Sequence, residues 1–169
     1  YKVIDWLDAD NTHEGYGAED DEYLSLENPY RPANRLMVSP SELTAVYGIE
    51  QDDYYCIKPY ITALPAPTYI NINTAPAEVI SVLAPGITLG AARQVAESRP
   101  EDGYTSVGQF TSHVVFAGLS LNQNTLTLRS NYFLATSTAT AGRQSVTLYS
   151  LLEKQQAGVS VVRRSLGVY

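Results

Sequence analysis

The stretch Ala75–Ile87 reads APAEVISVLAPGI, and it repeats in a longer form the earlier stretch Ser39–Ile49, SPSELTAVYGI. In both copies a proline stands where the first turn of a helix tolerates it, and a glycine follows where helices commonly end. Ser39 and Glu42 also have the spacing of a capping box. Each copy therefore predicts a short helix that begins just after its first residue and ends before its glycine.

A second helix is expected after each copy, at about Asp52–Tyr60 and at Leu89–Ser98. Within Leu89–Ser98 the small and apolar side chains recur at the spacing of one helix face. The two copies thus predict two short helical hairpins. Since one such hairpin buries little apolar surface, we expect the two to pack together into a small helical unit.

The hydrophobic period falls from about 3.6 residues to two at Thr125. Four stretches then have the pattern of strands: Thr125–Leu128, Tyr132–Ala135, Ser145–Tyr149 and Val159–Val162. Turns at Ala141-Gly142 and Ala157-Gly158 would join sequential strands into an antiparallel meander. Helices followed by strands indicate the α+β class. No amphipathic helix in the sequence is long enough to cover this sheet, so we expect a covering helix from a missing N-terminal part or from a partner.

Eight carboxylates lie between Asp5 and Glu22, in the sequence DWLDADNTHEGYGAEDDE, without one Lys or Arg. The whole chain has a formal charge of −7, so the acidity is concentrated in this segment. Hard divalent cations neutralise such clusters by taking six to eight oxygen ligands. Gly15 and Gly17 would let the loop turn sharply. The sequence therefore predicts a calcium loop, with these candidate ligands: Asp5, Asp8, Asp10, Glu19, Asp20 and Asp21.

This loop matches an EF-hand only in part. Asp8, Asp10 and Glu19 fit the first, third and twelfth positions, but Thr12 and His13 replace the usual Asp or Asn and the required Gly. A calcium loop outside the EF-hand class is the favoured interpretation. A solvated acidic loop without a cation is the alternative, although aromatic and leucine side chains interleave with the acids.

Composition restricts the class of protein. With 169 residues, 44% hydrophobic and 17% charged, the chain can form a sizeable core. Cys56 is the only cysteine, which excludes an internal disulfide. No apolar run approaches the length of about 20 residues that a membrane span needs. Thirteen tyrosines against three phenylalanines weakly favour a protein-binding surface, and the start at Tyr1 indicates an excised or processed piece.

Catalysis and nucleic-acid binding are the other function classes to weigh. Two histidines and one cysteine leave little scope for nucleophilic catalysis, and no phosphate loop or zinc spacing occurs, so we expect no enzyme. The stretch Asn71–Gly103 resembles the helix-hairpin-helix of competence-type DNA receptors. It carries four acids against two arginines, whereas phosphate binding needs a basic surface. A DNA-binding protein of that type is the alternative function, and we expect no nucleic-acid partner.

Taken in order, the motifs resemble the GspK-type minor pseudopilins of bacterial type II secretion systems. The motifs that carry the resemblance are Asp5–Asp10, Gly17–Asp20, Tyr23–Leu26, Pro29–Arg31, Ala33-Asn34, Ser41–Leu43, Ile70–Pro76 and the terminal Arg163-Arg164. The resemblance covers nearly the whole chain. It implies a pilin-like antiparallel sheet with an inserted helical domain of helix-hairpin-helix or SAM-like type, and an N-terminal helix that this chain lacks.

The resemblance also implies a function. Such a protein would sit at the tip of a pseudopilus, bound to the I-type and J-type minor pseudopilins, start pseudopilus assembly and contribute to protein export. Its soluble domain would lie at the periplasmic face of the inner membrane, anchored by the missing helix, and secreted proteins are further candidate partners. The domains expected are 1–34 with the calcium loop, 35–120 with the helical hairpins, and 121–169 with the sheet.

Overall fold

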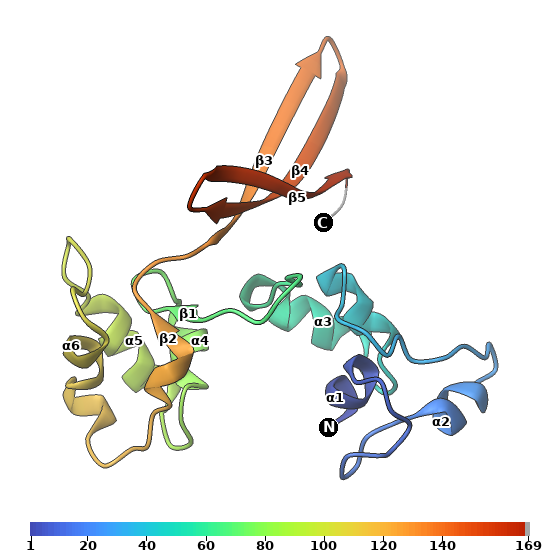
Figure 1. The fold of residues 1–169 in the computed structure, drawn as a ribbon, viewed down its shortest axis with the longest axis horizontal. Helices are drawn as coiled ribbons and strands as arrows, with labels where there is room; N and C mark the ends of the chain where they lie inside the picture. Colours follow the sequence, from blue (N-terminus) through green and yellow to red (C-terminus); the bar gives the residue numbers. More distant parts are fainter. Residues whose placement is uncertain (168–169) are drawn as a thin grey trace. The chain divides into compact units, whose positions relative to one another are not determined.

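Two separate hydrophobic cores organise residues 1–167, the part of the chain that this computed structural model describes. One core belongs to a unit that ends at Pro67, and the other belongs to a unit that starts at Thr68 (Figure 1). Each copy of the repeated pattern lies in a different unit with its own core, so the two hairpins do not share one helical unit as expected. The division at Pro67 falls inside the predicted domain 35–120, and the three predicted domains remain predictions.

The first unit consists of short helices around a cluster of aromatic rings. Its elements are α1 (Lys2–Leu7), α2 (Asp20–Leu24), η1 (Pro40–Ala45), α3 (Gln51–Ile57) and η2 (Lys58–Tyr60). Tyr23 is fully buried, with its ring centroid 5.5 Å from that of Trp6 and 5.3 Å from that of Tyr30. The Tyr23 hydroxyl accepts the backbone N–H of Tyr47 at 3.0 Å. Part of the tyrosine excess is therefore core, held by hydrogen bonds to the backbone.

The first copy of the repeated pattern forms the predicted helix, although its geometry is 3-10. Glu42 accepts the backbone N–H of Ser39 at 3.1 Å, as the capping-box spacing predicted. The turn after this helix places Gly48 at φ +69°, which favours glycine. A second helix follows at Gln51–Ile57, close to the predicted range.

The second unit starts with a helical part that has its own core. Its elements are β1 (Ile70–Asn71), α4 (Ala77–Ser81), α5 (Leu89–Glu97), α6 (Val107–Thr111), η3 (Val114–Phe116), η4 (Gln123–Thr125) and β2 (Leu126–Thr127). α4 and α5 form the hairpin predicted from the second copy and pack against each other. Ile80, Val95 and Phe110 are fully buried in the core that they share.

The strand at Leu126–Thr127 does not belong to the meander, which corrects the prediction for Thr125–Leu128. It pairs in parallel with β1, with Leu126 opposite Ile70. The side chain of Asn73 explains this pairing, because it donates to the carbonyls of Tyr104 at 3.1 Å and Leu128 at 3.2 Å and accepts the N–H of Tyr104 at 2.7 Å. One half-buried amide thus joins the backbone at Tyr104 to the backbone at Leu128.

The remaining strands form the predicted antiparallel meander. They are β3 (Tyr132–Ala141), β4 (Gln144–Gln155) and β5 (Gly158–Leu166), in the order β3-β4-β5. Pairing in register places seven larger apolar side chains on one side of the sheet, where Lys154 and Arg164 also lie, while Leu134, Tyr149 and the buried Leu151 lie on the other side. This apolar face consists of Phe133, Val146, Leu148, Leu152, Val159, Val161 and Leu166. Five of the seven are exposed to solvent, Val159 and Leu166 to 67%.

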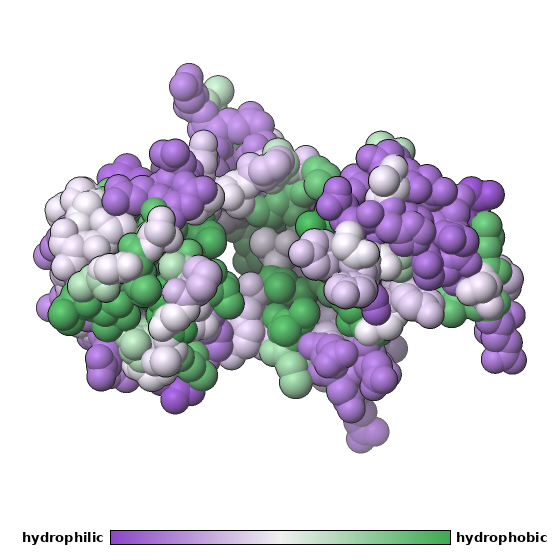
Figure 2. Space-filling view, turned by 90° about the horizontal axis from the view of Figure 1, so that it is seen from below, coloured by the Kyte–Doolittle hydropathy of each residue, from purple (hydrophilic) through white to green (hydrophobic). Residues whose placement is uncertain are grey.

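Hydrophilic surface dominates the first unit, seen on the right of Figure 2, in keeping with its many acids. Among the described residues, no helix combines the length and the apolar character that crossing a membrane requires. The most distinctive polar feature of the described residues is the acidic loop of the first unit.

Candidate metal centre

The acidic loop connects α1 with α2 and is held in place by the side chain of Asp5. The Asp5 side chain is fully buried in α1, and its carboxylate accepts the backbone N–H of Glu14 at 3.3 and 3.4 Å. Gly17 lies directly against this carboxylate, because a Cβ there would stand 1.7 Å from Asp5 Oδ2. The loop therefore needs glycine at this position for close approach to Asp5.

Asp8, Asp10 and Glu19 converge above this support. Each contributes a carboxylate oxygen, and these three oxygens lie within 4.8 Å of one another. Asp8 follows the last residue of α1, and Glu19 precedes the first residue of α2, so the two helix ends bring them together. Three of the six predicted ligands thus share one site.

Glu19 is the most unusual member of this group, because its side chain is fully buried. Among residues 1–167, neither of its carboxylate oxygens has a hydrogen-bond partner, and Oδ1 of Asp8 is buried and unpartnered as well. A buried carboxylate without a partner is costly, and native proteins nearly always pair such groups or use them to coordinate metals. The orphaned oxygens therefore point to a positive ligand in the group.

Electrostatics in the group favour the same ligand. Burial raises the pKa of Glu19, and the charges of Asp5 and Asp8 raise it further. Burial also raises the pKa of Asp8, followed by repulsion from Asp10 and Asp5. A bound cation would reverse both pKa shifts by favouring the ionised carboxylates.

The donor set fits a hard cation. It consists of three carboxylates, and Asp10 Oδ1 is oriented by the backbone N–H of Thr12 at 2.8 Å. Carboxylate oxygens suit calcium, which completes its shell with carbonyls and water. Soft thiolate ligands are absent from the group, which disfavours zinc of the structural type.

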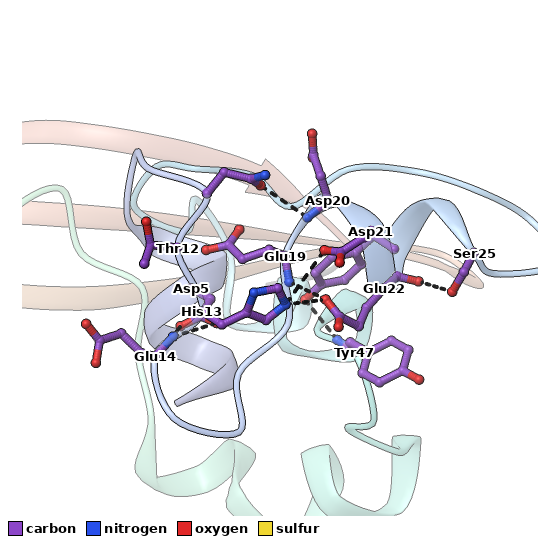
Figure 3. Close-up of polar contacts among 12 residues, drawn as sticks. Asp5, Thr12, His13, Glu14, Glu19, Asp20, Asp21, Glu22, Ser25 and Tyr47 are labelled. Atoms are coloured by element: carbon purple, nitrogen blue, oxygen red, sulfur yellow. Dashed lines mark hydrogen bonds and ion pairs between the residues drawn. The ribbon is translucent and has the colours of Figure 1, made fainter.

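A second group lies beside the first and contains His13, Asp21 and Glu22 (Figure 3). His13 Nε2 lies 2.7 Å from a carboxylate oxygen of Glu22 and 3.6 Å from one of Asp21. Glu22 also accepts the backbone N–H of Glu19 at 2.9 Å, which caps α2. The pKa of Glu22 is lowered to about 2, mainly by the hydrogen bond from the Glu19 N–H and next by the hydrogen bond with His13. The same contact with Glu22 raises the pKa of His13.

Asp20 is engaged elsewhere. Its side chain forms an ion pair with Arg31, and its backbone N–H donates to Asn11 Oδ1 at 3.3 Å. The six predicted ligands therefore divide by position: Asp8, Asp10 and Glu19 converge, Asp5 supports the loop, Asp20 meets Arg31, and Asp21 joins His13. Sequence reasoning missed the role of Glu22, although its spacing from Glu19 is that of a helix cap.

The stretch Asn71–Gly103, which resembles a helix-hairpin-helix in sequence, uses its two asparagines and Arg99 within the fold. The Asn73 side chain is bonded to the backbone as described above, and Asn71 donates to Ser130 Oγ at 3.0 Å. Arg99 donates to the carbonyl of Ala75 at 2.7 Å. The asparagines and Arg99 therefore have structural partners.

Comparisons with known proteins agree across the helical regions of both units. Residues 1–66 match the first-domain profile, and residues 70–129 a further profile, of the family described as type II secretion system (T2SS), protein K. Together these two matches account for most of the chain. They lend no support to the DNA-receptor alternative.

Individual relatives carry the same description. The chain is 37% identical over 174 residues to type II secretion system protein K of Pectobacterium carotovorum, and 32% over 168 residues to that of Pseudomonas aeruginosa. These alignments cover 99% and 98% of this chain but only 53% and 50% of the relatives. The chain thus spans about half the length of the curated relatives it matches.

A solved structure is also similar. The chain superposes with a TM-score of 0.84 and 28% identity on a chain of the GspK-GspI-GspJ complex from the type 2 secretion system of enterotoxigenic Escherichia coli. The match covers 99% of this chain and 62% of the solved chain. At this identity and coverage, the likeness extends over the helical part and the sheet alike.

Proposed function

This chain belongs to the type II secretion system protein K family, and we propose that it is the larger soluble part of a minor pseudopilin at the tip of a pseudopilus. There it would initiate pseudopilus assembly and contribute to protein export. The observation that carries this proposal is the likeness, at a TM-score of 0.84, to a chain of the GspK-GspI-GspJ complex. The work of such a protein is binding.

The partners we propose are an I-type and a J-type minor pseudopilin. The relative in the solved complex was crystallised with proteins of these two types. Exposed aromatic side chains such as Tyr16, Tyr55 and Tyr69 offer contact area of the kind enriched at interfaces. Secreted proteins are further candidate partners at a tip.

The sheet supports a pilin-like arrangement. Its apolar face is exposed in residues 1–167, and a sheet face of this kind is normally covered by another layer. We propose that an apolar helix from the part of the protein outside this chain packs on it. The same helix would anchor the protein in the inner membrane and leave the described units on the periplasmic side.

We further propose that Asp8, Asp10 and Glu19 bind calcium, with Asp5 holding the loop in place. The buried, unpartnered carboxylate of Glu19 supports this proposal most directly. Bound calcium would tie the end of α1 to the start of α2, because Asp8 and Glu19 flank these helices. The ion would thus stabilise the fold rather than take part in chemistry.

Co-purification tests the tip proposal. The soluble region of the whole protein would be mixed in calcium with the soluble domains of the I-type and J-type proteins at about 50 μM, well above the dissociation constant of a specific complex. We expect one three-protein complex on size-exclusion chromatography. If the protein elutes alone under these conditions, while the I-type and J-type proteins bind each other, the tip proposal is wrong.

A further inference from the structure

The apolar face of the sheet carries a positive charge among its apolar side chains. Arg164 on β5 stands opposite Ser150, near the middle of β4, and both lie on the side of the apolar face. Leu148 and Leu152 flank Ser150 on that side of β4, and Leu166 comes next on that side of β5. The side chain of Arg164 is exposed in residues 1–167. An exposed guanidinium thus stands within an apolar surface.

No acidic residue lies on this face in the described part of the sheet. Glu153 is the only acid of β3, β4 and β5, and it lies on the other side, where it accepts the hydroxyl of Tyr132 at 2.8 Å. Lys154 is the only other charged side chain on the apolar face. Within residues 1–167 Arg164 forms no ion pair. The positive charge of Arg164 is therefore uncompensated on this face.

A layer packed on the apolar face would change the surroundings of Arg164. Its guanidinium would lose contact with water, and a buried charge is costly unless it is paired and hydrogen-bonded. A guanidinium has five N–H donors, more than the hydroxyl of Ser150 can accept, and a carboxylate accepts two of them side by side. Lys154 is placed differently, because it lies beside the turn between β4 and β5, where its long stem can reach water.

We propose that the helix covering the sheet carries a carboxylate that pairs with Arg164, which makes Arg164 a positioning residue for this helix. The proposal rests on the function proposed above, in which the helix comes from the part of the same polypeptide outside residues 1–169. Enough chain exists, since about half of each matched relative lies outside the alignment. A helix that is apolar throughout could slide along an apolar face, whereas one buried ion pair fixes its register.

Thermal melts of Arg164→Met test this proposal in the whole protein, in detergent micelles and without any other pseudopilin. The variant keeps an apolar side chain and leaves the proposed carboxylate buried without a partner. We expect the melting temperature of the second unit to fall by about 5 °C or more at pH 7. Lys154→Met is the matched control on the same face and should melt within about 1 °C of the wild type. Equal melting of the two variants would overturn the proposal.

Acid should remove the difference between Arg164→Met and the wild type. A carboxylate beside Arg164 would have a lowered pKa in the folded wild type, so its contribution to stability is present above the unfolded pKa and is lost as the pH falls. In the variant the same carboxylate would be buried alone, and protonation would relieve that cost. Lys154 keeps its charge throughout. The difference in melting temperature should therefore shrink between about pH 6 and pH 3. A constant difference would indicate packing alone and overturn the proposal.

Replacing the Asp and Glu residues outside residues 1–169 by Gln, one at a time, locates the partner of Arg164. One replacement should cost much in the wild type and little in the Arg164→Met protein, because such coupling is confined to neighbouring groups. If no acid of the same chain couples to Arg164, or if coupling appears only after the I-type or J-type protein is added, the proposal is wrong.

Val161→Ser separates failure of the ion pair from failure of the covering helix. Val161 lies on the same face and is 46% exposed in residues 1–167. A covered face should lose stability with this variant whether or not Arg164 is paired. No loss would mean an uncovered face, which overturns the ion pair together with the helix. Because these melts contain no partner protein, they are independent of the co-purification that tests the tip function.

Discussion

Calcium should stabilise the first unit and leave the second unit unchanged, because Asp8, Asp10 and Glu19 all lie before Pro67. A ligand at 100 times its dissociation constant adds about 2.7 kcal/mol to the free energy of unfolding. For a unit of about this size, 1 kcal/mol shifts the melting temperature by about 4–8 °C. The expected increase is therefore about 11–22 °C in the transition of the first unit.

Differential scanning calorimetry in calcium and in chelator measures this increase. The decisive variant is Glu19→Gln, which keeps the shape of the buried side chain and removes its charge. A tenfold loss of affinity would cost about 1.4 kcal/mol, or half of the calcium-dependent shift. In chelator the same variant should melt at the wild-type temperature or above, because an unpartnered buried charge has been removed.

Glu27→Gln is the matched control, since Glu27 is exposed and lies outside both carboxylate groups of the same unit. It should retain the full calcium response. Equal melting in calcium and chelator would refute the reasoning, as would a Glu19→Gln protein with an undiminished response. A response in the second unit instead of the first would place the ion elsewhere.

Other substitutions test the surrounding structure. Gly17→Ala should destabilise the first unit and weaken its calcium response in thermal melts, because a Cβ would stand 1.7 Å from Asp5 Oδ2. Gly90→Ala, in open space within α5, should stabilise the second unit by about 0.5–1 kcal/mol in the same melts. Glu22 has a pKa lowered to about 2, below its ordinary value of about 4.3. Its contribution to stability should therefore be complete above about pH 5 and decline towards pH 2. Denaturant titrations across that range should show a weaker pH dependence for Glu22→Gln. Asn73→Ala should cost about 2–4 kcal/mol in urea unfolding of the second unit, since three hydrogen bonds are lost, and an unchanged unfolding curve would show that they are replaced. Duplex DNA at low salt should give no gel shift with the wild-type protein, whereas a salt-sensitive shift at micromolar concentration would reopen the DNA-receptor interpretation.

Local sequence signals predicted the helices and the meander well. The capping spacing of Ser39 and Glu42, the helical face within Leu89–Ser98 and the alternation after Tyr132 depend on neighbours only a few residues away. The parallel pairing of Ile70 with Leu126 could not be predicted in this way. It joins two-residue strands far apart in the chain, and the side chain that explains it, Asn73, acts through the backbone of two other segments.

The acidic loop, too, could be predicted from the sequence only in part. That carboxylates without counter-charges would converge followed from the sequence, and Asp8, Asp10 and Glu19 do so. The sequence did not show which of the acids would lie outside this group. The ion pair of Asp20 with Arg31 depends on the path of the segment after α2, where Arg31 lies between Pro29 and Pro32. The contact of Asp21 with His13 depends on how the loop closes.

Trp6 gives the first unit a spectroscopic signal of its own. It is the only tryptophan in the chain, and it is buried. In the sequence it stands between Asp5 and Asp8, the first of the three convergent carboxylates. Excitation beyond the tyrosine band would therefore report on this unit alone, without light from the thirteen tyrosines. Any reordering of the loop would alter the emission of this indole, while unfolding of the sheet would remain optically silent.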